Sequence, residues 1–128
     1  MVSGSVVITV PMMPPRECSP NFHGHWSVMS KARAEFRQAA YYATLGLCGA
    51  DKEWLGFRYG KPTVVDITVA WCCGRKRMDD DNLVAAIKSA RDGIVDGAHM
   101  TSDRDFVTGT VTQTRGDGIT IITLREAG

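Results

Sequence analysis

The chain has 128 residues, of which 44% are hydrophobic and 23% charged, and its formal net charge is +1. This length fits one compact domain, so we expect a single domain over residues 1–128. No apolar run is long enough to cross a membrane and the first residues lack the features of a secretory signal, which together predict a cytoplasmic protein. A net charge near zero excludes whole-chain attraction to phosphate, so any nucleic-acid binding must come from local patches.

The N-terminal part of the chain predicts a strand, a rigid loop and a helix. Residues 5–10 form a β-branched run, and the prolines of residues 11–21 exclude both a helix and a central strand. Ser30 is a suitable N-cap for a helix that Gly49 can close. The core face of this helix, read from its 3.6-residue period, consists of Phe36, Ala39, Ala40, Ala43 and Leu47.

A second face of the same helix carries Arg33, Arg37 and Tyr41 at four-residue steps. Such a stripe is most often a solvated surface. The alternative is contact with the phosphates of a nucleic acid, and we keep Arg33 and Arg37 as candidates for it.

The remaining elements are a strand, a second helix and two further strands. Residues 62–73 are rich in β-branched side chains, and a helix runs from Leu83 to about Val95 with Asp81 as its cap. The core face of this helix consists of Leu83, Ala86, Ile87, Ala90 and Ile94, and Gly93 weakens its end. Residues 106–114 and 118–124, separated by "RGDG", predict a hairpin. The fold class is therefore α/β (α+β), a mixed sheet of about four strands with two main helices packed on it, in the order β-α-β-α-β-β.

The cysteines and histidines give no strong signal. Cys18, Cys48, Cys72 and Cys73 follow no disulfide-framework spacing, which favours reduced thiols, the last two on a buried strand. Cys18 with His23 and His25 could form a metal site on paper, but their spacing matches no common zinc pattern. We therefore interpret the two histidines as ordinary loop residues.

The most unusual stretch is "RKRMDDDNL", residues 75–83. Adjacent aspartates repel one another, so their repulsion must be offset by cations or by a metal ion. In an extended chain Asp79 and Asp81 would share one side while Asp80 faces the other. Two convergent carboxylates suit magnesium, or manganese as an alternative, whereas an EF-hand is excluded because Val84 and Ala90 stand where it needs glycine and glutamate. A solvated, locally paired surface cluster remains the competing interpretation.

Further charged residues extend this candidate site. Lys88 lies two helical turns, about 10 Å, beyond the aspartates and should lean back toward them, with Asp92 as its ion-pair partner. Asp103 or Asp105 could supply a third carboxylate. With the basic residues Arg75, Lys76 and Arg77 to position a nucleic-acid backbone, the set predicts metal-assisted hydrolysis of a phosphodiester.

At "DDDNL" with its lysine-bearing helix and later aspartate, residues 75–106 resemble the RusA-type Holliday junction resolvases, small endonucleases of bacteria and phages. "PPRECSPN" is similar to their proline-rich loop with an asparagine, so the resemblance covers about half of the chain and its aspartate-asparagine-leucine core is fairly specific. It implies that Asp79 and Asp81 bind magnesium, that Lys88 is catalytic and that Asn82 orders the turn. Asp103 is our choice for the third acidic residue, with Asp105 as the alternative, and the spacing of Asp92 from Lys88 gives Asp92 a supporting role. One departure is Ala85, where some members carry the lysine; the position of Lys88 matches phage members.

The resemblance also implies a homodimer that makes paired, symmetric nicks across a four-way DNA junction, in recombination and repair. Met78 could wedge between bases at the branch point, although a buried methionine is the more common outcome. Three other hypotheses compete with a junction resolvase. They are a nuclease of broader specificity for branched DNA, a DNA-binding protein without catalysis, and a structural protein with a solvated acidic cluster.

Overall fold

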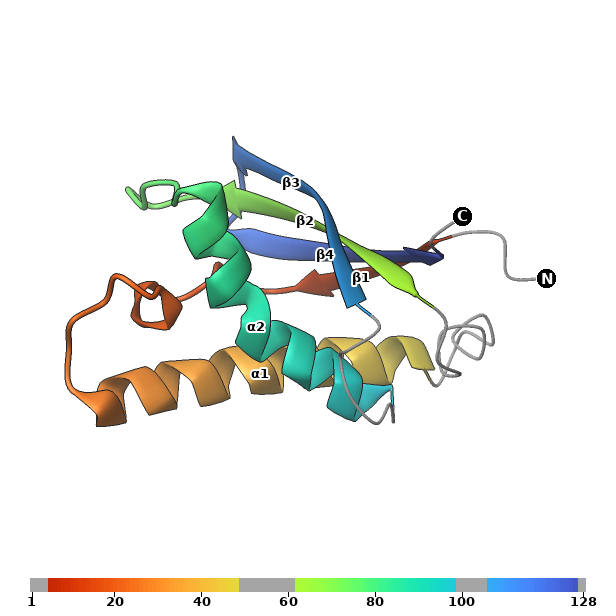
Figure 1. Ribbon diagram of the computed structural model, residues 1–128, viewed down its shortest axis with the longest axis horizontal. Coiled ribbons are helices and arrows are strands. Elements are labelled where there is room, and N and C mark those ends of the chain that lie inside the picture. Colours follow the sequence, from red (N-terminus) through yellow and green to blue (C-terminus); the bar gives the residue numbers. More distant parts are fainter. Residues whose placement is uncertain (1–4, 49–61, 99–105, 127–128) are drawn as a thin grey trace.

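The computed structural model describes residues 5–48, 62–98 and 106–126 (Figure 1). Strand β1 (Ser5–Val10) leads through a one-turn 3-10 helix, η1 (Arg16–Cys18), to helix α1 (Trp26–Cys48). Strand β2 (Thr63–Trp71), helix α2 (Asp80–Gly97), and strands β3 (Phe106–Arg115) and β4 (Ile119–Glu126) follow. This is the expected α+β fold, with four strands and two main helices in the order β-α-β-α-β-β. No helix within the described ranges is both long and apolar enough to cross a membrane.

The four strands form one mixed sheet in the order β1-β4-β2-β3. Strand β2 pairs in parallel with β3 and antiparallel with β4, and β4 pairs antiparallel with β1. The predicted hairpin of residues 106–114 and 118–124 is therefore wrong, because β2 lies between β3 and β4.

The glycines of the "RGDG" segment, which suggested a hairpin, instead allow close packing at the end of β2. The backbone N–H of Gly116 donates to the carbonyl of Trp71, the last residue of β2, at 3.0 Å. A Cβ at Gly116 would lie 2.8 Å from that of Ala70, and Gly118 has a φ of +76°. The glycines thus let residues 116–118 cross closely over the end of β2.

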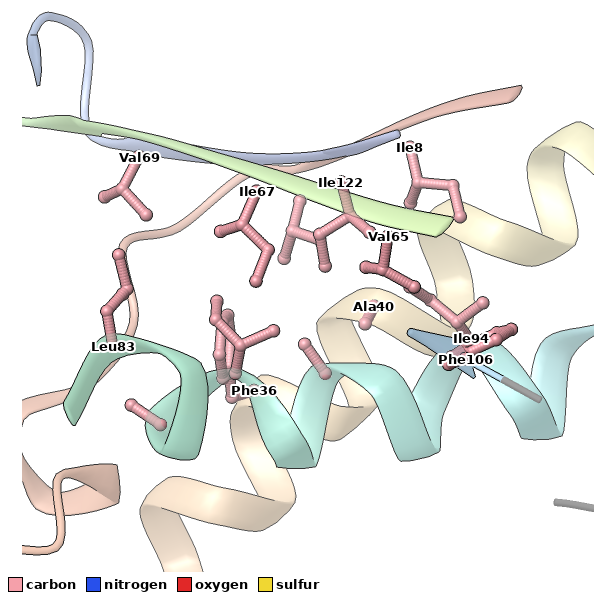
Figure 2. Packing of buried hydrophobic residues seen from close by; sticks show 14 of the residues in the cluster. Ile8, Phe36, Ala40, Val65, Ile67, Val69, Leu83, Ile94, Phe106 and Ile122 are labelled. Carbon is pink, nitrogen blue, oxygen red and sulfur yellow. The ribbon is translucent and has the colours of Figure 1, made fainter. Parts of the chain in front are cut away.

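Both helices cover the same face of the sheet, and the core lies between them and the strands (Figures 1 and 2). Alternate residues of β2 are buried, as the two-residue period of a strand requires. Phe36 and Ala40 of α1 and Leu83 and Ile94 of α2 are fully buried beneath them (Figure 2). Every residue of the predicted α2 core face is buried, and the predicted α1 core face also packs into this core.

Helix α1 begins at Trp26, four residues before the predicted cap Ser30. The carbonyl of His25 accepts hydrogen bonds from the amides of Val28 and Met29, at 3.1 and 3.3 Å. Its ring Nδ1 accepts a third from the amide of Ser27 at 3.1 Å. His25 therefore satisfies the free amides of the first turn, which other caps do with an oxygen atom.

Strand β2 ends at Trp71, two residues before the predicted end at residue 73. Cys72 is half-buried and Cys73 exposed, with a positive φ of 60°, so neither lies on a buried strand. The described cysteines Cys18, Cys72 and Cys73 are free thiols. Within the described ranges no three His, Cys, Asp or Glu side chains are grouped to hold a metal, which leaves the Cys18 and histidine alternative without support.

Candidate functional site

The acidic cluster, Asp79–Asp81, lies where the chain enters helix α2. Asp79 is the N-cap residue, and its carbonyl accepts a hydrogen bond from the amide of Leu83 at 2.9 Å. The helix therefore begins at Asp80, and the predicted start at Leu83 with Asp81 as cap is wrong. Because Asp80 and Asp81 are helical, the side-to-side alternation of an extended chain does not apply to them. Carboxylates in a first helical turn are stabilised by the positive end of the helix dipole, which offsets part of their mutual repulsion.

Asp80 differs from its neighbours because Gln113 of β3 binds it. The side-chain Nε2 of Gln113 donates to Asp80 Oδ1 at 2.8 Å and to the carbonyl of Met78 at 2.7 Å. Its Oε1 accepts from the amide of Met78 at 3.1 Å and from Trp71 Nε1 at 2.9 Å. One side chain thus holds the end of β2, the segment before α2 and the first turn of α2 together. Asp80 therefore has a structural partner.

Asp79 and Asp81 are exposed, and no cation or hydrogen-bond donor within the described ranges contacts their carboxylates. In chemical type, two such carboxylates fit a hard divalent cation, which takes oxygen ligands and keeps several waters. A complete set of three acidic ligands is not formed by the described residues. Asp103 and Asp105, the two candidates for the third, lie outside them.

Lys88 and Asp92 form the ion pair expected from their spacing. Lys88 Nζ lies 3.5 Å from Asp92 Oδ1 on the exposed side of α2. Asp92 also lines a groove of about 310 Å³ between α1 and α2, with Arg33 and Arg37 on its other wall. Helix α2 therefore directs Asp92 toward α1.

The two candidate arginines of α1 have different environments. Arg37 donates from Nε and Nη2 to Asp96 Oδ2, at 2.9 and 2.7 Å, and this hydrogen bond raises the pKa of Arg37 above its ordinary value. Its guanidinium thus ties α1 to α2. Arg33 is exposed and lines the groove next to it.

The basic segment, Arg75–Arg77, divides into one anchored and two exposed side chains. Arg75 Nη2 donates to the carbonyl of Pro14 at 2.8 Å, and its guanidinium lies 5.1 Å from the ring centre of Trp71. Burial, and then the nearby charge of Arg16, lower the pKa of Arg75, although an arginine remains charged. Lys76 and Arg77 are exposed beside it. Arg75 therefore fixes the proline-rich loop against the segment that precedes the acidic cluster.

Asn82 and Met78 flank the acidic cluster in different ways. Asn82 is half-buried in the first turn of α2, next to Leu83 of the core. Met78 is half-buried and packs against the core, as expected for the more common role of a methionine. Part of the Met78 side chain therefore packs against the hydrophobic core.

Two residues of this region were not found from the sequence. They are Gln113, described above, and Arg115, which donates to the carbonyl of Arg75 at 3.4 Å. Both line a cavity of about 280 Å³ together with Trp71 and Arg77. No signal in the sequence could have placed them, because β3 was expected to pair with β4 and not with β2.

No known protein-family model matches the chain. It is 34% identical over 101 residues to an uncharacterized protein of Xylella fastidiosa. The aligned region is 78% of this chain and 61% of that protein, so the chain spans about three-fifths of the relative's length.

Proposed function

We propose that this protein is a magnesium-dependent, structure-specific endonuclease that hydrolyses paired phosphodiesters of a four-way DNA junction. The observation that carries the proposal is that two carboxylates, Asp79 and Asp81, which no other described side chain contacts, lie next to the basic segment Arg75–Arg77 at one end of the sheet. Carboxylates hold the metal and cations hold the DNA backbone, so a phosphodiesterase needs both in one place. The resemblance of residues 75–106 to the RusA-type resolvases supports the same reaction.

The residues have distinct proposed roles. Asp79 and Asp81, with Asp103 or Asp105, hold magnesium, or manganese as an alternative. Once bound, this ion supplies positive charge at the phosphate and lowers the pKa of an attacking water.

The chain's cations contact the phosphates. Lys88, supported by Asp92, neutralises charge at the reacting phosphate. Lys76 and Arg77 bind the flanking phosphates, and Arg33 is a candidate for a more distant contact. Arg37 is left out of the DNA contact because Asp96 binds its guanidinium.

A homodimer accounts for paired nicks, because one site in each subunit can face one of two opposed strands. We propose this assembly, and a role in DNA recombination and repair in a bacterial cell or phage-infected host, on the resemblance alone.

Cleavage of a labelled mobile four-way junction, with and without magnesium, tests the proposal. The informative pair of variants is Asp81→Asn and Asp80→Asn, which remove the same charge at neighbouring positions. Asp80→Asn retains an oxygen that can accept from Gln113, so it should cut at close to the wild-type rate. Asp81→Asn should bind the junction and lose cleavage by at least about 100-fold.

The control is a linear duplex of matched sequence, which should stay intact. Equal loss of cleavage in both variants would show that the effect is one of local charge and not of metal binding. A junction that stays whole with the wild type in both magnesium and manganese would reject the nuclease.

A second candidate function is junction binding without catalysis. It is favoured by Ala85, which stands where some resolvases carry their lysine, and by the ion pair at 3.5 Å that engages Lys88 with Asp92. Such a protein would bind the junction with a strong salt dependence and cut it under no metal condition. The cleavage experiment above separates the two candidates.

A further inference from the structure

A pocket of about 530 Å³ lies between the proline-rich loop and the segment that leads to the acidic cluster. One wall is made by Arg16, Asn21 and Phe22, and the other by Gly74, Lys76 and Met78. We call it the loop pocket. The two chain segments that carry these residues, 16–22 and 74–78, lie at the end of the molecule where β2 gives way to α2 (Figure 1). Its volume falls in the range of about 300–1,000 Å³ that is common for sites that hold small molecules.

Both walls of the loop pocket are held in place by hydrogen bonds. The Arg75 side chain joins them, because its guanidinium donates to the carbonyl of Pro14. Within the loop wall, Ser19 accepts two hydrogen bonds. Its Oγ accepts from the amide of Asn21 at 3.2 Å and its carbonyl from the amide of Phe22 at 3.1 Å. The pocket is therefore built before any ligand arrives.

Phe22 provides an aromatic surface with a fixed position. A Cβ at Gly24 would lie 2.3 Å from two atoms of the Phe22 ring, so the ring packs directly on the bare backbone of this glycine. Phe22 remains partly exposed at the pocket wall. Any larger residue at position 24 would displace the ring. An aromatic ring in this setting can stack on a flat, apolar ligand group.

Three cationic side chains from the described part of the chain line the loop pocket. Arg16 and Lys76 are exposed on opposite walls, Arg75 lies between them, and none of the described residues that line the pocket is acidic. Asn21 adds an amide that can both donate and accept. Cations that converge repel one another unless an anion lies among them. The lining thus combines cations that can bind a phosphate, an aromatic ring on which a base can stack, and an amide that can form hydrogen bonds with the edge of a base.

We infer that the loop pocket binds one unpaired nucleotide of the DNA substrate, with its base stacked on Phe22 and its phosphate between Arg16 and Lys76. A paired base cannot enter, because its faces are covered by its neighbours in the duplex and its edge by its partner. Met78, on the pocket wall, directly precedes Asp79. A nucleotide in the pocket therefore lies beside the proposed reaction centre. The inference rests on the proposed function in taking DNA as the substrate, and it deepens that function by giving the site a reason to prefer branched over continuous duplex DNA.

Binding without metal tests this inference independently of cleavage. The probe is a fluorescently labelled single-stranded hexanucleotide, compared with the same sequence as a blunt duplex, in buffer that contains a chelator. Loss of one base–aromatic stack should weaken binding of the single strand by about ten-fold in Phe22→Leu, and Arg16→Gln should weaken it as well. The matched control is Tyr42→Leu, which removes an exposed aromatic ring from α1. It should bind as the wild type does.

A second readout uses a junction with 2-aminopurine at the branch point. Stacking on Phe22 should change its emission with the wild type and with Tyr42→Leu, and should not do so with Phe22→Leu. Thermal unfolding of each variant controls for folding, and Arg16→Gln, an exposed substitution, carries the test if Phe22→Leu unfolds.

The outcomes separate the two proposals. If both Phe22→Leu and Arg16→Gln bind the single strand with wild-type affinity, the loop pocket does not bind a nucleotide. This holds even if junctions are cut with dependence on Asp81. Phe22-dependent binding of the single strand by a protein that cuts no junction supports the pocket and rejects the nuclease.

Discussion

The side-chain amide of Gln113 in β3 donates to Asp80 at the start of α2, across 2.8 Å and 33 residues of chain. Three further hydrogen bonds of the same side chain reach Trp71 and Met78. Gln113 therefore sets where the acidic cluster begins relative to the sheet.

Substitution of Gln113 by alanine should destabilise the protein by about 2 to 3 kcal/mol, because it leaves the buried Trp71 N–H without its acceptor. The free energy of unfolding in urea measures this loss. Thr112→Val, at an exposed position of the same strand, is the control and should change stability by less than about 0.5 kcal/mol. Equal effects of the two substitutions would contradict a specific role for Gln113.

Gly93 should not tolerate alanine, although alanine favours helices. A Cβ at this position would clash with the carbonyl oxygen of Arg37 in α1, because the two helices pack closely there. We expect Gly93→Ala to lower the free energy of unfolding by about 1 to 3 kcal/mol. Gly46→Ala is the matched control, because nothing lies within 4 Å of its added Cβ. It should stabilise the protein by about 0.5 to 1 kcal/mol through helix propensity alone, and a stabilised Gly93→Ala would show that the helices can move apart freely.

Asp66 should give the stability of the protein a pH dependence at acid pH. Arg125 Nε and the amide of Thr110 both donate to its carboxylate at 2.8 Å. The hydrogen bond from Arg125, and then that from Thr110, lower the pKa of Asp66. The ionised form therefore stabilises the folded state above the ordinary aspartate pKa of about 3.9, and this contribution is lost as the pH falls through the lowered pKa.

The test compares the wild type with Asp66→Asn from pH 7 to pH 2. The difference in free energy of unfolding should be constant down to about pH 4 and then shrink. A difference that is unchanged at the lowest pH would mean that the carboxylate charge does not contribute.

The salt dependence of junction binding should separate Arg77 from Arg37. Arg77 is exposed beside the acidic cluster, whereas Asp96 binds Arg37. We expect Arg77→Gln to reduce the slope of log affinity against log salt by about 1, the value for one lost phosphate contact, and Arg37→Gln to leave it unchanged. Titrations of a labelled junction in a chelating buffer at several salt concentrations measure both slopes. A reduced slope for Arg37→Gln alone would place the DNA on α1.

The buried face of α2 could be predicted because it follows from the spacing of apolar residues within one short segment of the sequence. Leu83, Ala86, Ile87, Ala90 and Ile94 repeat with the period of a helix, and all five are buried. The first residue of each helix was harder to predict from the sequence. His25 caps α1 through a ring nitrogen, a residue type that rarely serves as a cap, and Asp79 to Asp81 could each have begun α2.

The order of the strands could not be predicted from local patterns. Glycines at 116 and 118 are typical of a hairpin turn, but the pairing of β2 with β3 is decided by contacts between residues about 43 positions apart, such as Thr63 and Phe106. The role of Gln113 depends on that pairing and was missed with it. The acidic cluster could be recognised in the sequence because its composition is unusual, but the helical conformation of Asp80 and Asp81 was not predicted.

The place of β4 in the sheet bears on how the chain folds during synthesis. Among the described strands, β1 pairs with β4 alone. The residues of β4 follow those of β1 by more than a hundred positions, and β4 separates β1 from β2. The sheet therefore cannot close before β4 has left the ribosome, and until then the apolar side chains of β1 and β2 have no strand between them. Pairings this distant in sequence slow folding and prolong the exposure of unpaired strand edges. A nascent chain arrested before residue 119 would contain the residues of both helices but would lack the strand that lies between β1 and β2.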